Sequence, residues 1–204
     1  MPADYAELQQ QIISEAWRSG DAEFAALVPG YIQRAELRIS RSLRVAEMEA
    51  TATVTLTDGA GPLPSDFMQA RCVIAAVSPP SVLRPITPSY ARARFPENPG
   101  GYPRFYTITG NTITTFPAST GDLTLDYYAK IPPLSDTNVT NWLLEQAPDL
   151  YLYGALVEAS PSMIDTQGLQ TWLTMYRAAL NDIQTSDKGK RWAGSRARVS
   201  GPTP

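Results

Sequence analysis

Few side chains of this 204-residue chain could carry out catalysis. The chain has no histidine, which excludes imidazole general-base catalysis and the Ser-His and Cys-His mechanisms. Its single cysteine, Cys72, lies in the apolar run from Arg71 to Val77, so we expect a buried, unreactive thiol. One cysteine excludes an internal disulfide, and a zinc site built from carboxylates and one thiolate would be rare.

Carboxylate pairs are the remaining catalytic option, and none has a suitable spacing. Asp122 and Asp126 would share one strand face about 13 Å apart, wider than the roughly 5 to 9.5 Å between paired glycosidase carboxylates. Glu47 and Glu49 lie at a helix–strand junction, where solvated charge is the better interpretation. The pair Gly189-Lys190 lacks the upstream glycine of a phosphate-binding loop. The sequence therefore predicts no enzyme activity, no cofactor and no metal.

Basic residues collect at the C-terminus, which suits binding better than catalysis. Residues 1–186 hold 12 basic and 19 acidic residues, whereas residues 187–204 hold five basic residues and one acidic residue. We predict an extended tail that cannot fold alone and that docks on a protein partner; a solvated tail and a phosphate- and base-binding tail are the alternatives. The candidate partner-binding residues of this tail are Lys188, Lys190, Arg191, Trp192, Arg196 and Arg198.

Proline separates a β region in the middle of the chain from helical flanks. Twelve of the 18 prolines lie between Pro62 and Pro133, and an interior proline costs a helix about 3 kcal/mol. Alternating or apolar runs predict strands, and the loop 78–103 is expected to hold one short helix at 90–94. The predicted strands are residues 51–57, 71–77, 105–109, 112–116 and 122–129.

Arginine in the long proline-rich loop adds a second candidate interface. Arg84, Arg92 and Arg94 are opposed there by Glu97 alone, and arginine suits protein interfaces because it keeps its charge and binds carboxylates in a fork.

Apolar residues at helical spacing predict the flanking helices. Asp4 caps a first helix that ends at Gly20, a short helix follows from Asp21 to Leu27, and a longer one runs from Pro29 to about Val45. The C-terminal flank predicts helices at 142–146, from Pro148 to about Ser160, and from a cap at Asp165 to about Ile183. Residues 150–157 are apolar on every side, so this helix is buried between other helices or against a partner subunit.

The fold class that follows is α+β. A helical bundle from both flanks would carry an inserted small antiparallel β domain and a flexible C-terminal tail. The expected parts are residues 1–48, 49–136, 137–186 and 187–204. No run of 18 apolar residues predicts a membrane span, and the acidic N-terminus is unlike a signal peptide. The buried helix and the proline-rich loop indicate a structural component of an assembly.

Five segments resemble the head–tail adaptor (connector) family of tailed bacteriophages, which forms the ring between portal and tail. The last segment is the longest match. The segments are PGYIQRAELRISRSLR (29–44), LPSDF (63–67), YTITGNTI (106–113), LDYYAKIPPLSD (125–136) and TNWLLEQAPDLYLYGALVEA (140–159).

This resemblance implies a structural virion protein that docks under the portal protein and provides the platform for a tail or nozzle protein. It implies a homo-oligomeric ring of twelve copies that encloses double-stranded DNA without sequence-specific binding. It also implies assembly in the host cytoplasm and a final place in the neck of the virion. A nucleic-acid-binding protein or a small hydrolytic phage-encoded protein is the alternative.

The matched segments contain residues with expected roles in the fold. Asp66 would bond to local backbone amides, Gly110 would supply a positive φ, and Gly154 would allow close helix packing. The arginines of the long N-terminal helix (Arg34, Arg38, Arg41 and Arg44) would pair with acidic groups on neighbouring subunits. The remaining fold-motif residues are Leu63, Pro64, Phe67, Asn141, Trp142, Pro148, Asp149 and Tyr151.

Overall fold

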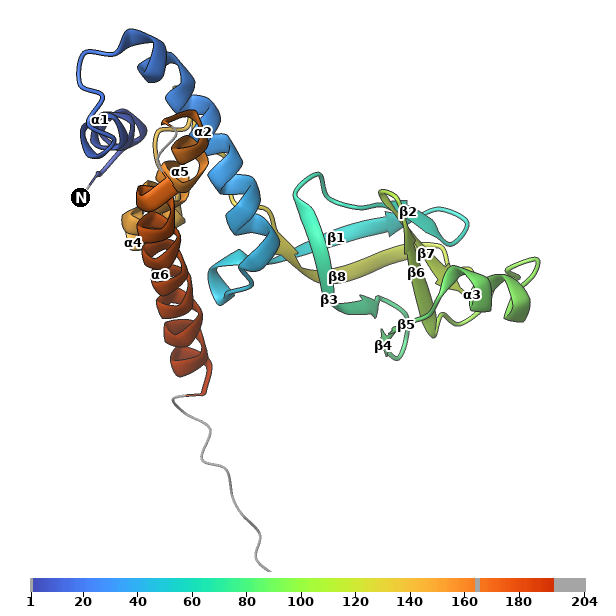
Figure 1. The fold of residues 1–204 in the computed structure, drawn as a ribbon. Helices are drawn as coiled ribbons and strands as arrows, with labels where there is room; N and C mark the ends of the chain where they lie inside the picture. Colours follow the sequence, from blue (N-terminus) through green and yellow to red (C-terminus); the bar gives the residue numbers. More distant parts are fainter. Residues whose placement is uncertain (1, 164–165, 193–204) are drawn as a thin grey trace, which may run out of the picture. The chain divides into compact units, whose positions relative to one another are not determined.

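The computed structural model describes residues 2–163 and 166–192, and it divides the chain into two compact units. The chain up to Glu47 and from Ile131 onward forms a helical unit, and Met48–Lys130 form a β unit (Figure 1). The predicted α+β class, with helical flanks and a β insertion, is confirmed.

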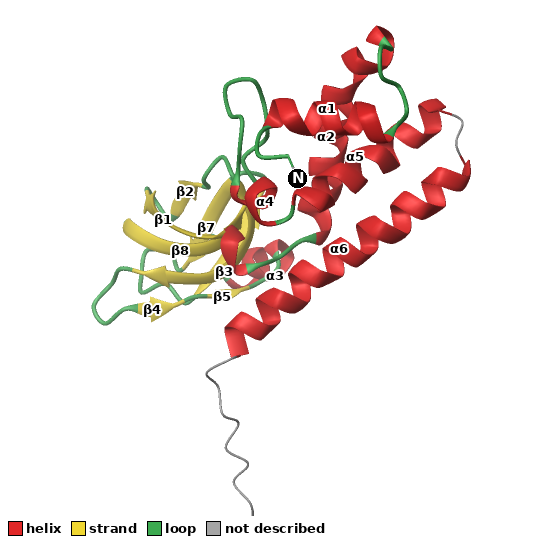
Figure 2. Ribbon diagram, turned by 90° about the vertical axis from the view of Figure 1, so that its left-hand side faces the viewer, coloured by secondary structure: helices red, strands yellow, loops and turns green. Residues whose placement is uncertain are grey.

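The helical unit is built around the helix that is apolar on every side. Its α-helices are α1 (Tyr5–Glu15), α2 (Ala22–Ser42), α4 (Trp142–Gln146), α5 (Pro148–Met163) and α6 (Thr166–Trp192). Helix α5 packs against the other four (Figure 2), and its buried residues include the consecutive runs 150–152, 154–157 and 159–160, which cover every side of the helix. Of the two expected environments, the structure shows burial between helices of the same chain.

Helix α2 is continuous where the sequence predicted two helices. Asp21 caps it by accepting a hydrogen bond from the backbone N–H of Phe24 at 3.0 Å, and it then runs through Pro29 without a break. A proline in a helix forfeits one backbone hydrogen bond. Buried residues on both sides of Pro29, among them Val28 and Ile32, compensate for that loss through their packing.

Helix α1 ends earlier than predicted. Asp4 caps it as expected, accepting from the N–H of Glu7 at 2.8 Å, but the last helical residue is Glu15. Trp17 follows with φ +56°, in the left-handed region, and Gly20 with φ +88° completes the turn before α2.

Helix α6 is longer than predicted. It continues nine residues beyond Ile183 to Trp192, so residues 187–192 are helical and not extended. Tertiary contacts stabilise this extension: Asp187 is buried and accepts from the N–H of Ala46 at 2.8 Å, and the Lys190 ammonium lies 3.0 Å from a Glu47 carboxylate oxygen. Asp165, the expected cap, and residues 193–204 lie outside the described residues. Helix α5 likewise passes Pro161 and reaches Met163.

The β unit contains two four-stranded sheets, with strand orders β1-β8-β3-β4 and β2-β7-β6-β5 (Figure 1). Their inner faces form one apolar core that includes Leu56, Val73, Ile113 and Leu125. The strands are β1 (Glu49–Leu56), β2 (Ala60–Pro62), β3 (Phe67–Ala75), β4 (Ser81–Val82), β5 (Arg84–Pro85), β6 (Phe105–Thr109), β7 (Thr112–Phe116) and β8 (Gly121–Ala129). A short 3-10 helix, η1 (Ala46–Met48), precedes them, and α3 (Pro88–Arg94) joins β5 to β6.

One strand pair departs from the expected antiparallel pattern. Arg84 and Pro85 run parallel to Phe105 and Tyr106, whereas the other pairs of named strands are antiparallel. A parallel pair needs a long crossover connection, commonly helical, and residues 86–104 with α3 provide it. The predicted proline-rich loop is therefore partly ordered as β4, β5 and α3.

Close packing at Gly154 gives a first test of the helical unit. A Cβ at this position would lie 3.1 Å from the Ala35 Cβ of α2 and 3.5 Å from the Tyr176 ring of α6. We expect Gly154→Leu to lower the free energy of unfolding by about 1–3 kcal/mol through overpacking, measured by urea denaturation followed by circular dichroism. In contrast, Gly30→Ala in α2, where a Cβ meets nothing within 4 Å, should raise it by about 0.5–1 kcal/mol. A Gly154→Leu protein as stable as the parent would contradict this packing.

Candidate functional site

A chain of buried hydrogen bonds joins α2, α4 and α5 in the helical unit. Glu36 Oε1 accepts from the N–H of Leu134 at 2.8 Å and from the Tyr151 hydroxyl at 3.3 Å. The Tyr151 oxygen in turn accepts from Asn141 Nδ2 at 2.8 Å, and Nδ2 also donates to the Pro132 carbonyl at 2.7 Å. These bonds fix the segment that leads from the β unit back into the helices.

Burial governs the electrostatics of this network. Desolvation raises the pKa of the Glu36 carboxyl, although the hydrogen bonds from Leu134 and Tyr151 act in the opposite direction. Burial, together with the Glu36 charge, also raises the pKa of Tyr151 far above its usual range. The hydroxyl therefore stays protonated and remains a donor. The network positions the backbone and offers no open face to a ligand.

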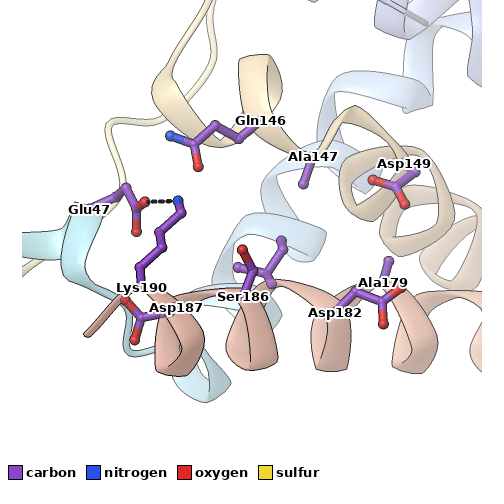
Figure 3. A pocket seen from close by; sticks show the side chains of 10 residues that line it. Glu47, Gln146, Ala147, Asp149, Ala179, Asp182, Ser186, Asp187 and Lys190 are labelled. Carbon is purple, nitrogen blue, oxygen red and sulfur yellow. Dashed lines mark hydrogen bonds and ion pairs between the residues drawn. The ribbon is translucent and has the colours of Figure 1, made fainter. Parts of the chain in front are cut away.

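A pocket of about 250 Å³ lies between the start of α5 and the last turns of α6. Figure 3 shows Asp182, Asp187 and Lys190 on α6 lying along one side, with Glu47 and Asp149 on the other elements that line it. The pocket holds four carboxylates and one ammonium group. The lining residues are Glu47, Gln146, Ala147, Asp149, Ala179, Asp182, Ile183, Ser186, Asp187 and Lys190.

Sequence analysis missed this pocket because its residues come from three separate segments. The six α6 members recur every three or four residues over positions 179–190, so they share one helix face. That spacing was readable in the sequence. The contributions of Glu47 and Asp149 were not, because they depend on how the helices pack.

The residues predicted to form the basic tail are only partly within the described chain. Lys190 lines the pocket and pairs with Glu47, whereas Lys188 is exposed on α6. Arg191 and Trp192 are the last two residues of that helix. Arg196 and Arg198 lie outside the described residues.

The three candidate arginines of the proline-rich segment are exposed on the β unit. Arg84 lies on β5, and Arg92 and Arg94 lie in the last turn of α3, where positive charge complements the helix dipole. The Arg94 guanidinium lies 5.7 Å from the centre of the Phe95 ring, which packs against Phe105 at 6.2 Å. These arginines are available to a partner, and nothing in the β unit gives them a catalytic role.

The fold motifs of the β unit act through tertiary contacts. Leu63 is buried, and its N–H donates to the Asn111 carbonyl at 2.9 Å. The Asp66 carboxylate accepts from the Tyr127 hydroxyl at 3.0 Å, so the expected bonding to local amides is not what the structure shows. The Phe67 ring lies 5.8 Å from that of Tyr127, next to half-buried Pro64.

The remaining motif residues begin turns and helices. Gly110 has φ +59° in the β6–β7 hairpin. Asn141 caps α4 by accepting from the N–H of Leu144 at 2.9 Å, and the half-buried Trp142 is the first residue of that helix. Pro148 and Asp149 form the start of α5, where a carboxylate complements the dipole.

Arg34, Arg38 and Arg41 lie on α2, whereas Arg44 follows its last residue, Ser42, and two of these four arginines pair within the chain. Arg38 Nε donates to Glu158 Oε1 on α5 at 2.8 Å, and Arg34 Nε lies 3.7 Å from the other oxygen of the same carboxylate. Both arginines thus already have an acidic partner in their own chain, and their pairing with neighbouring subunits stays a prediction. Arg44 donates to the Ser40 carbonyl at 2.7 Å, and Arg41 is exposed.

The cysteine and the two aspartates considered above as catalytic candidates lie on strands β3 and β8, where they face neighbouring strands. Cys72 is half-buried on β3 and not fully buried as expected, and its register partner is Asp126. Asp126 and Asp122 accept from the hydroxyls of Thr51 and Thr55 on β1, at 2.6 and 2.8 Å.

Within residues 2–163 and 166–192 no group of three or more acidic, cysteine or histidine side chains could hold a metal ion. None of the helices in this part of the chain combines the length and apolarity needed to cross a membrane.

Removing one hydroxyl tests the buried network. Tyr151→Phe leaves Glu36 and Asn141 each short of one partner, and we expect the free energy of unfolding to fall by about 1–3 kcal/mol. Tyr153→Phe on the same helix is the matched control, because the Tyr153 ring stacks on Trp172 at 6.1 Å and the ring is retained. The control should stay within about 0.5 kcal/mol of the parent. Equal effects of the two substitutions in urea denaturation would argue against the network.

Titration of Glu36 gives a pH-dependent prediction. Because its pKa is higher in the folded than in the unfolded chain, the folded state favours the protonated form. The stability of the parent relative to Glu36→Gln should therefore rise as the pH falls from about 7 towards about 4.5, near the unfolded pKa of glutamate. Urea unfolding of both proteins across this range measures the difference. A difference that shrinks on acidification would show that the carboxylate is the favoured form.

Comparison with known proteins gives a family match for this chain. No curated protein matches the chain. A family model described as "SU10 adaptor protein" matches residues 3–200, nearly the whole sequence. That range includes both helical flanks and the β insertion. The chain therefore belongs to the SU10 adaptor family of phage head–tail adaptor proteins.

Proposed function

We propose that this protein forms the ring that docks under the portal of a tailed phage and carries the tail. The observation that supports this most is the family match over residues 3–200. The family implies interaction with portal and tail proteins. Our proposal adds a ring of twelve identical copies, assembled in the host cytoplasm and retained in the neck of the virion.

The charge distribution supports a ring that lets DNA pass. Residues 1–186 carry 12 basic and 19 acidic residues, so this part of the chain repels a phosphate backbone. Two of its arginines, Arg34 and Arg38, pair with Glu158, which offsets part of their positive charge. We infer that double-stranded DNA is enclosed without sequence-specific binding.

The portal contact that we propose lies at the end of the chain. Arg191, Trp192, Arg196 and Arg198 combine positive charge with one large aromatic anchor, the combination found in energetically dominant interface residues. Twelve copies of such a contact would bind with high avidity even when each one is weak.

A pair of truncations tests this contact. Truncation after Lys190 removes Arg191, Trp192, Arg196 and Arg198 but keeps the Asp187–Ala46 and Lys190–Glu47 contacts. The expected product has the thermal stability of the parent but no longer joins purified portal rings in co-sedimentation and negative-stain electron microscopy. Truncation after Thr185 would be less informative, because it also removes those two contacts.

Truncation after Arg198 is the matched control. It shortens the chain by six uncharged residues and keeps the basic residues and Trp192. This variant should join portal rings as the full chain does. Normal joining by the protein truncated after Lys190 would overturn the proposed docking role of the tail.

A further inference from the structure

The pocket beside α6 has a composition that the proposed ring function leaves unexplained. Ala147, Ala179 and Ile183 contribute apolar surface, and four carboxylates surround it. A cationic side chain already lies within it, because Lys190 pairs with Glu47 at 3.0 Å. Asp149 and Asp182 have no salt-bridge partner among residues 2–163 and 166–192. The pocket thus fits a further basic side chain on a short apolar or small-residue segment.

The chain itself continues into a segment of matching chemistry. One face of α6, which ends at Lys190, lines the pocket. The helix itself ends two residues later, at Trp192. Residues 193–204 follow, with sequence AGSRARVSGPTP. They carry Arg196 and Arg198, small residues around them, and no acidic residue.

We propose that residues 193–204 dock in the pocket of their own chain, with Arg196 or Arg198 binding the carboxylates of Asp149 and Asp182. Asp182 lies ten residues before Trp192, about 15 Å along the helix. Twelve residues can span up to about 40 Å, so the segment is long enough to turn back. Arginine is suited to this role because its planar fork binds carboxylates in pairs.

Attachment to the same chain favours this occupant over a second copy. A short tether holds the segment near the pocket at an effective concentration in the millimolar range, well above the concentration of other chains in a dilute solution. The inference concerns the free protein and does not depend on the proposed ring or on portal binding. In the docked state the arginine that binds the pocket is withheld from any external partner.

Paramagnetic relaxation in the full-length protein tests this docking directly. A nitroxide is attached at Ala197→Cys in a Cys72→Ser background, and the backbone amide signals of residues 179–187 are followed by NMR. We expect these signals to broaden at low salt and to recover at high salt, because the contact is electrostatic. In the Asp149→Asn/Asp182→Asn protein, the docked population should fall about fivefold.

Glu23→Gln/Asp136→Asn is the matched control, since it removes the same charge from exposed positions outside the pocket. It should leave the broadening unchanged. The proposal is overturned if the amides of residues 179–187 are not broadened, or if the pocket and control variants behave alike. Broadening of an isotope-labelled chain by a separate nitroxide-labelled chain would also overturn it, because the occupant would then be a second copy.

Discussion

The buried carboxylate of Glu36 is the constraint on which the helical unit depends. An ionisable group away from water is costly unless its hydrogen bonds are satisfied. The partners of Glu36 are Leu134 and Tyr151, 98 and 115 residues further along the chain. The N-terminal helices are therefore complete only when the segment after the β unit has returned and α5 is in place. Glu36 thus links the segment before the β unit with the segment that follows it.

Much of the fold was predictable because it depends on local periodicity. The alternation in residues 105–116 with Gly110 at the turn gave the β6–β7 hairpin with its observed bounds. Asp4, Asp21 and Asn141 were recognisable helix caps because an N-cap bonds to an amide two or three residues away. The short helix at residues 90–94 also proved to be real, as the last five residues of α3.

Features that depend on distant partners could not be predicted from sequence. Pro29 indicated a helix start, yet packing on both sides of it keeps α2 continuous. The last turns of α6 have weak local signals, and their order follows from the contacts of Asp187 and Lys190 with residues 46 and 47. The role of Glu36 was missed because a lone glutamate on a helix is normally solvated. The acidic pocket was missed because three segments build it.

The arrangement of the two units has a consequence for synthesis on the ribosome. Met48–Lys130 are contiguous, so the β unit has all of its strands once this stretch has emerged. Helices α1 and α2 emerge earlier, yet they must wait for α5 to cover their apolar faces, and α5 in turn waits for α6. The earliest part of the chain thus belongs to the last unit completed. Until then its apolar side chains stay open to chaperones or to premature association.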